Sequence, residues 1–470
     1  MLFSGATFLF LFLPFVITVY YTLLRNNRKL QNIFLCLVSI VFYAWGEPAF
    51  VFVMLLSITA NYLFGLYIGK RIKNNNNSGC KTVLILSVIF NLLILFVFKY
   101  LAFTISSINQ FFGLSLNVPS IALPIGISFF TFQAMSYVVD VYRGEAYQKN
   151  ILNVGLYISF FPQLIAGPIV RYETVANQIE YRKETFSDFS SGVYRFILGL
   201  GKKVLIANNM AVVADAFFDG NISSISCLSA WVGAVAYTFQ IFFDFSGYSD
   251  MAIGLGRMFG FHFLENFRYP YISTSITEFW RRWHISLGTW FRDYLYFPLG
   301  GSRVEKKSRL VFNLFMVWLM TGIWHGANWT FIVWGLMYFV LLVIEKQTGL
   351  HKSEKFKPLR YIYTIFFVII GWVIFRASSI ENAVEYIGAM FGFSGISADN
   401  SALFYLKENV FGFVLALLAS TPVFRKLYEK YLSESKGGQV FVAVSLIIIF
   451  LLSVIYIVKG TYNPFIYFNF

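Results

Sequence analysis

Long apolar stretches recur along this chain of 470 residues and limit the folds open to it more than any other feature. Many hold about 20 residues, which as a helix is enough to cross a hydrocarbon core of about 30 Å. Hydrophobic residues make up 58% of the chain and charged residues 13%, and a soluble globule could not bury so much apolar surface. The sequence therefore predicts an all-α, polytopic integral membrane protein with roughly 11–13 membrane helices.

The positive charge is distributed in short clusters between the apolar stretches. The formal net charge is +14, and its clustering is typical of cytoplasmic loops, not of a nucleic-acid-binding stripe. The first cluster, formed by Arg25, Arg28 and Lys29, follows the first apolar stretch. This order predicts that the amino terminus is external. The distribution of charge predicts a chain embedded in a lipid bilayer and no nucleic-acid partner. No separate soluble segment is visible, so we expect one domain over residues 1–470.

Two segments depart from the pattern of simple spans. YISFFPQLIAGPIVRYE contains Pro162, Gly167 and Pro168, which predicts a re-entrant or broken helix. Glu278–Tyr296 is too charged to span and predicts an interfacial or partly re-entrant amphipathic element on the cytoplasmic side. The aromatic ending TYNPFIYFNF is expected at a membrane interface.

His325 stands near the end of an apolar stretch that begins after a basic loop. About 15 residues of helix from Leu310 cover about 22 Å, which would place His325 past the midplane, toward the outer face. We expect it at the turn of a helical hairpin, where Gly322 and Gly326 would leave room for a substrate. A neutral imidazole suits general-base catalysis; the alternative is a core histidine bonded to a backbone carbonyl. The neighbouring Trp324 and Asn328 favour the active-site interpretation and are candidate binding residues.

His284 lies among arginines and aromatic residues. Arg281, Arg282 and Arg292 could clamp the phosphates or pantetheine arm of a thioester donor, or could instead reach lipid phosphates. His284 would position a substrate or cap local polar groups. Asp244, in an aromatic span, is a further candidate for substrate binding, with a structural ion pair to a nearby arginine as the alternative.

Several motifs together carry a resemblance to a known family. They occur in the order PIGISFFTFQ, FFPQLIAGPI, FFDFSGYSDMAIGLGRMFGF, NFRYPY, EFWRRWHISLGTWFRDYLYFPLGG, MTGIWHGANW and YNPFIYFNF. With these motifs the chain resembles the membrane-bound O-acyltransferase family, most closely its bacterial alginate O-acetylation branch. The resemblance implies helices around a central channel, a place in the bacterial inner or plasma membrane, and two catalytic candidates. His325 matches the near-invariant family histidine, and His284 matches a second position that is Asn, Asp or His across the family.

The resemblance implies transfer of an acyl group, expected to be acetyl. The co-substrate would be a cytoplasmic acyl thioester, either acetyl-CoA or an acyl carrier protein, docked on Arg257, Arg281, Arg282 and Arg292. The acceptor would be a hydroxyl of an extracytoplasmic polysaccharide or of an accessory acetyltransferase. His284 would mark donor entry and His325 the distant site of transfer. We expect no bound cofactor and no metal, because a thioester is already activated. The alternatives are D-alanyl transfer from a carrier protein to teichoic acid and, in another class, a glycolipid transporter or flippase.

Overall fold

The computed structural model describes residues 1–352, 356–460 and 465–466, and these residues form helices and loops without a β-strand. Within them, nine helices are long and apolar enough to cross a membrane. The all-α, multi-pass membrane architecture is therefore confirmed. The number of such helices is below the expected 11–13, partly because the first apolar helix, Phe8–Tyr21, is short and α6 (Ile127–Tyr142) has only 16 residues.

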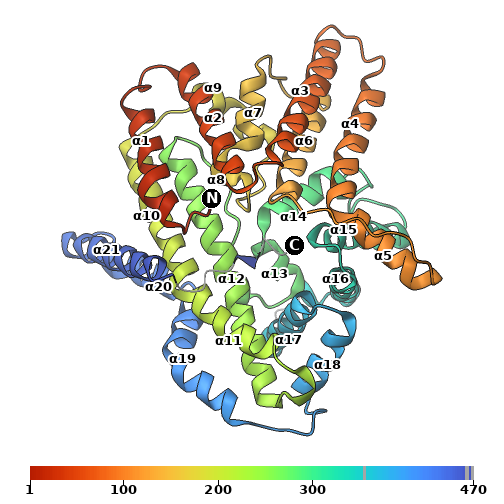
Figure 1. Cartoon of the computed structure of the whole chain (residues 1–470), viewed down its shortest axis with the longest axis vertical. Helices are drawn as coiled ribbons and strands as arrows, with labels where there is room; N and C mark the ends of the chain where they lie inside the picture. Colours follow the sequence, from red (N-terminus) through yellow and green to blue (C-terminus); the bar gives the residue numbers. More distant parts are fainter. Residues whose placement is uncertain (353–355, 461–464, 467–470) are drawn as a thin grey trace. The chain divides into compact units, whose positions relative to one another are not determined.

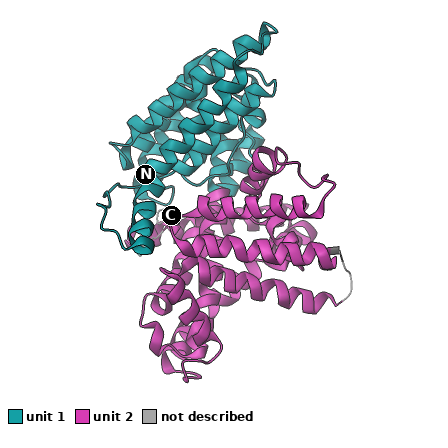
Figure 2. Cartoon of the chain, turned by 90° about the vertical axis from the view of Figure 1, so that its right-hand side faces the viewer, with its two compact units in different colours: residues 1–196, 251–264 teal, residues 197–250, 265–470 magenta. Residues whose placement is uncertain are grey.

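The chain divides into two compact units, coloured separately in Figure 2. Unit 1 contains residues 1–196 and 251–264, and unit 2 contains residues 197–250 and 265–470. Two of the three boundaries fall inside the helices α10 (Phe186–Gly201) and α12 (Cys227–Met258), and the third falls in the loop after α12. Each unit is described by itself below, with helix labels as in Figure 1; η marks short π- or 3-10 segments.

Unit 1 is built mainly from the amino-terminal helices. They are η1 (Phe8–Phe12), α1 (Leu13–Tyr21), α2 (Arg28–Gly46), α3 (Val51–Lys73), α4 (Cys80–Leu95), η2 (Phe96–Tyr100), α5 (Leu101–Phe112), α6 (Ile127–Tyr142), α7 (Ile151–Ser159), α8 (Phe161–Leu164) and α9 (Tyr172–Tyr181). Helices α2 and α3 follow each other across the short segment 47–50. The predicted broken helix is confirmed, because α7 ends before Phe160 and α8 starts after it.

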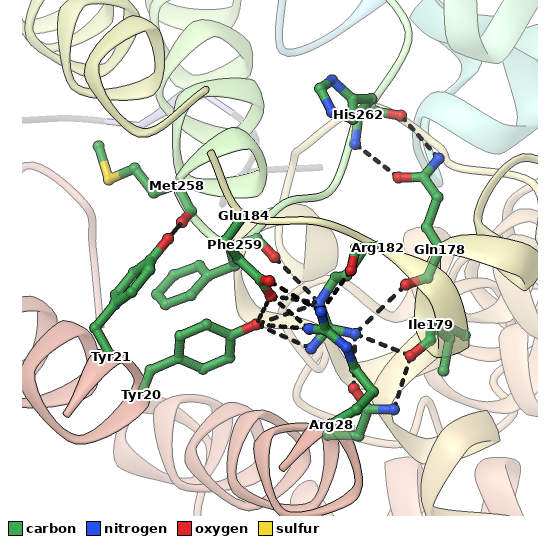
Figure 3. Close-up of polar contacts among 11 residues, drawn as sticks. Tyr20, Tyr21, Arg28, Gln178, Ile179, Arg182, Glu184, Met258, Phe259 and His262 are labelled. Atoms are coloured by element: carbon green, nitrogen blue, oxygen red, sulfur yellow. Dashed lines mark hydrogen bonds and ion pairs between the residues drawn. The ribbon is translucent and has the colours of Figure 1, made fainter. Parts of the chain in front are cut away.

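A buried arginine organises the polar interior of unit 1 (Figure 3). The guanidinium of Arg182 donates to the Tyr20 hydroxyl at 3.1 and 3.2 Å, to Asn32 Oδ1 at 2.7 Å and to the Phe259 carbonyl at 3.1 Å. Glu184 accepts from Arg28 at 2.9 Å and also from the Tyr20 hydroxyl. This Arg182 network, as we call these six residues, joins α1 and α2 to the loop after α9 and to the end of α12.

Unit 2 holds the remaining helices. They are η3 (Lys202–Ala207), α11 (Asn208–Phe218), η4 (Ile222–Ser224), η5 (Pro270–Ile272), α13 (Ile276–Arg282), α14 (Ile285–Phe291), η6 (Arg292–Tyr296), α15 (Lys307–His325), α16 (Trp329–Thr348), η7 (Leu350–Lys352), α17 (Lys357–Arg376), α18 (Ile380–Met390), α19 (Asn400–Ala419), α20 (Val423–Leu427), η8 (Tyr428–Leu432) and α21 (Lys436–Val458). Helices α13, α15, α16 and α17 lie together within this unit (Figure 1).

The hairpin of α15 and α16 is closed by glycines. A Cβ on Gly322 would lie 2.5 Å from the Phe331 carbonyl oxygen, and one on Gly335 would lie 2.5 Å from the Trp318 carbonyl oxygen. A Cβ on Gly326 would overlap the Phe331 ring. The prediction that Gly322 and Gly326 leave room for a substrate is therefore wrong: α16 occupies that space, and the missing side chains allow the two helices to approach closely.

Candidate active site

His325 is the last residue of α15 and is surrounded by aromatic rings. Its ring centroid lies 5.0 Å from that of Trp324, 5.0 Å from that of Trp334 and 5.1 Å from that of Phe375. The side chain is 5% exposed. The predicted position at the turn of a helical hairpin is confirmed, since α16 begins four residues later. A neutral imidazole is the form of histidine that can accept a proton as a general base.

His284 connects α13 to α14 and is held by a buried amide. Its Nδ1 lies 3.2 Å from Asn266 Oδ1, and that oxygen also accepts from the Ser286 backbone N–H at 3.1 Å. An amide oxygen can only accept, so Nδ1 carries the proton and Nε2 presents its lone pair. Burial lowers the pKa of His284 to about 3, so this lone pair is available at neutral pH. Nε2 is buried and has no hydrogen-bond partner among the described residues.

The two histidines lie close to the same indole. The ring centroid of Trp324 is 6.1 Å from that of His284 and 5.0 Å from that of His325. The expectation that the histidines stand at the distant ends of a route is therefore wrong. The expectation came from the loop charges, which carry no information on how deeply the segment with His284 folds back into the protein. His284 is 2% exposed, so it is part of the interior of unit 2.

A carboxylate that the sequence analysis did not select fixes the segment before His284. Glu345, on α16, accepts from the backbone N–H groups of Ile276 at 2.6 Å and Thr277 at 2.9 Å, and from the Thr277 hydroxyl at 2.6 Å. These groups form the start of α13, where a negative charge is stabilising. Ser275 adds its own cap by accepting from the Glu278 N–H at 3.0 Å. A carboxylate in an apolar helix is the only sequence signal that could have revealed Glu345.

The four arginines proposed as a donor clamp differ in their surroundings. Arg282 pairs with Glu278 at 2.8 Å and Arg292 with Asp293 at 2.8 Å. Arg281 is exposed and makes no hydrogen bond or ion pair with the described residues. Arg257 belongs to unit 1, where its nearest polar partner is Ser191 at 3.5 Å. Within unit 2, Arg281 is thus the arginine of this set whose charge is most open to a ligand.

Asp244 forms a buried ion pair, but its partner is Lys203 and not an arginine. The distance is 2.7 Å, and the two side chains are 3% and 2% exposed. Asp244 Oδ2 also accepts from the Ile466 backbone N–H at 2.9 Å, and Phe465 and Ile466 are buried. These contacts give Asp244 a structural role. Of the aromatic ending, the structure therefore describes only residues 465–466, which pack inside the protein; residues 461–464 and 467–470 lie outside the described part of the chain.

Asn328 is engaged in holding the turn after His325. Its Oδ1 accepts from the Thr330 backbone N–H at 3.0 Å and caps α16, while its Nδ2 donates to the Ser378 carbonyl at 2.9 Å. Both halves of the amide therefore stabilise the loop that follows His325. Among the described residues, no group of three His, Cys, Asp or Glu side chains lies close enough to hold a metal ion.

Comparison with known proteins defines the class to which this fold and site belong. Residues 42–383 match the family described as "MBOAT, membrane-bound O-acyltransferase family". The chain therefore belongs to the membrane-bound O-acyltransferase family and is an O-acyltransferase.

Individual relatives narrow the comparison. A protein of Pseudomonas putida named "Probable alginate O-acetylase AlgI" is 39% identical over 493 residues, which cover 100% of both chains. The "Peptidoglycan O-acetyltransferase" of Helicobacter pylori is 32% identical over 521 residues, covering 100% of this chain and 98% of the relative. The "Teichoic acid D-alanyltransferase" of Bacillus subtilis is 31% identical over 275 residues, covering 53% of this chain and 68% of the relative. The full-length similarity is thus to O-acetyl-transferring proteins.

Proposed function

We propose that this chain moves acetyl groups from a cytoplasmic thioester, on coenzyme A or on an acyl carrier protein, to hydroxyls outside a bacterial cell membrane. The acceptor would be a polysaccharide or the hydroxyl of an accessory acetyltransferase. The observation that carries the proposal is the pair of histidines that share the Trp324 indole, one of them at the end of α15. The two relatives that match along the whole chain are named for acetylation of alginate and of peptidoglycan.

In this proposal His325 is the general base. Its imidazole takes the proton of the acceptor hydroxyl while the oxygen attacks the thioester carbonyl. Collapse of the tetrahedral intermediate breaks the C–S bond, and the protonated His325 returns the proton to the leaving thiolate. The products are an acetyl ester and a free thiol, so the reaction needs neither an oxidant nor a resident cofactor. His284 positions a substrate through its Nε2 lone pair, and Arg281 offers an exposed cation to the phosphates of the donor.

Replacement of His325 tests the proposal. His325→Ala is expected to abolish acetyl transfer from a labelled donor by the purified protein in proteoliposomes, with unchanged expression and thermal stability to within about 1 kcal/mol. His262→Ala is the matched control, because His262 is exposed and lies in unit 1, and its activity should equal that of the native protein. Undiminished transfer by a well-folded His325→Ala variant would refute the proposed role.

D-alanyl transfer to teichoic acid is the second candidate, favoured by the similarity of 31% over about half of the chain to the Bacillus subtilis protein. Mass spectrometry of surface polymers from cells with and without this chain separates the two functions. Acetyl esters that depend on the chain support the proposal, whereas D-alanyl esters support the second candidate. A glycolipid transporter would consume no thioester in the proteoliposome assay.

A further inference from the structure

Three aromatic side chains, one of which contacts His325, carry buried polar hydrogens that have no acceptor among the described residues. They are Trp280 on α13 and Trp334 and Tyr338 on α16. Trp334 and Tyr338 are 0% exposed, and Trp280 is partly exposed although its indole nitrogen is buried. A buried N–H or O–H without an acceptor is destabilising. We call these three residues the donor cluster; the acceptor atoms of a ligand would satisfy their buried hydrogens.

The donor cluster is continuous and reaches His325. Ring centroids are 5.4 Å apart for Trp280 and Trp334, 4.9 Å for Trp280 and Tyr338, and 5.2 Å for Trp334 and Tyr338. Trp334 in turn lies 5.0 Å from the His325 ring. Trp334 and Tyr338 are four residues apart on one helix, so they share a face of α16. Trp280 lies on α13. The start of α13 is bound to α16 by Glu345, which accepts hydrogen bonds from its backbone N–H groups.

The chemistry of these groups specifies what would bind them. An indole N–H can only donate a hydrogen bond, so a ligand of Trp280 and Trp334 must supply acceptor atoms. None of the three side chains is charged, and their surroundings are aromatic: Trp318 lies 4.9 Å from Trp280 and 5.5 Å from Tyr338. A phosphate or carboxylate would lose its hydration there without a counter-charge. Neutral carbonyl oxygens meet both conditions.

We propose that the donor cluster binds the carbonyl oxygens of the neutral arm of the acyl donor. Trp334, which contacts His325, donates to the carbonyl of the thioester, and Tyr338 and Trp280 donate to amide carbonyls of the pantetheine arm behind it. The assignment rests on the proposed function, since it takes the thioester as the substrate. The carbonyl oxygen becomes negative as the acceptor attacks, so a buried N–H directed at it stabilises the transition state more than the ground state.

Two unreactive pantetheine analogues test the assignment. S-acetonyl-pantetheine keeps a carbonyl next to the sulfur-bound carbon, and S-propyl-pantetheine lacks it; both keep the amides. Their affinities for the full-length protein in nanodiscs are measured by calorimetry. We expect the native protein to bind the acetonyl analogue about tenfold more tightly than the propyl analogue. Trp334→Phe should bring this ratio close to one. Tyr338→Phe should weaken both analogues about equally, because it removes a contact to an amide that they share.

A tyrosine with a satisfied hydroxyl provides the control. Tyr386 is buried in unit 2 and donates to the Ala230 carbonyl at 3.0 Å, so Tyr386→Phe should leave both affinities unchanged. Equal binding of the two analogues by the native protein would overturn the assignment, as would a preference that survives in Trp334→Phe. If Trp334→Phe does not fold, unchanged affinities in the isosteric Tyr338→Phe variant overturn it. If the native protein binds both analogues equally but His325→Ala loses acetyl transfer, this inference is refuted and the proposed function is not. Failure of the native protein to bind either analogue refutes the proposed donor as well.

Discussion

The Arg182 network of unit 1 and the donor cluster of unit 2 are both buried, but the polar atoms of the network are hydrogen-bonded and those of the cluster are not. In the network, the three guanidinium nitrogens of Arg182 find acceptors on Tyr20, Asn32 and Phe259. In the cluster, Trp334 and Tyr338 place their hydrogens where no described residue accepts them. Satisfied polar groups stabilise one arrangement of helices, and unsatisfied donors reduce stability until a ligand arrives. The contrast separates a region that maintains the fold from a region prepared for a substrate.

The largest expected effect breaks the network. Arg182→Ala removes the central donor and leaves the Tyr20 hydroxyl and Asn32 Oδ1 without their buried partner, so unfolding free energy should fall by about 3–5 kcal/mol. Thermal denaturation in detergent measures the loss. Arg281→Ala is the matched control, because Arg281 is exposed and makes no polar contact with the described residues, and it should change stability by less than about 0.5 kcal/mol.

Acidification should act on the region around His284. Its pKa is about 3 in the folded chain, against 6.5 for the free side chain, so below pH 6.5 the unfolded chain binds a proton that the folded chain does not. The contribution of His284 to the free energy of unfolding is therefore fully present above pH 6.5. Below pH 6.5 it falls by up to about 1.4 kcal/mol per pH unit. His284→Asn should remove this part of the pH dependence between pH 5 and 6.5. An identical acid profile in both proteins would show that His284 is accessible to protons.

The smallest effect compares two hydroxyl groups directly. Tyr20→Phe deletes a hydroxyl that bonds Arg182 and Glu184, and should cost about 1–2 kcal/mol of stability. Tyr338→Phe deletes a hydroxyl without a partner, so stability should stay unchanged or rise slightly, while transfer activity falls. Denaturation midpoints and initial rates of both variants measure the two effects. Equal destabilisation by both substitutions would remove the distinction between the two regions.

Hydropathy was sufficient to predict a multi-pass helical membrane protein, but neither the number of its long helices nor the contacts between them. The last long helix, α21, runs from Lys436 to Val458, because a continuous apolar run determines such a helix locally. The closeness of His284 and His325 depends on Glu345, which accepts from the start of α13 from 68 residues away or more. The space at Gly322 was predicted without knowing that Phe331 fills it. Such long-range contacts leave no periodic trace in a sequence.

The backbone at His284 bears on which residues can replace it. This residue adopts φ of +44° and ψ of +54°, a left-handed conformation in which Asn, Asp and His are several-fold enriched among residues other than glycine. The family resemblance gives Asn, Asp or His at the same position. A residue at this turn between α13 and α14 must therefore tolerate the left-handed backbone conformation, in addition to having a side chain suited to the site. Substitution at this position over evolution would be confined to a short set of residues before catalysis selects among them.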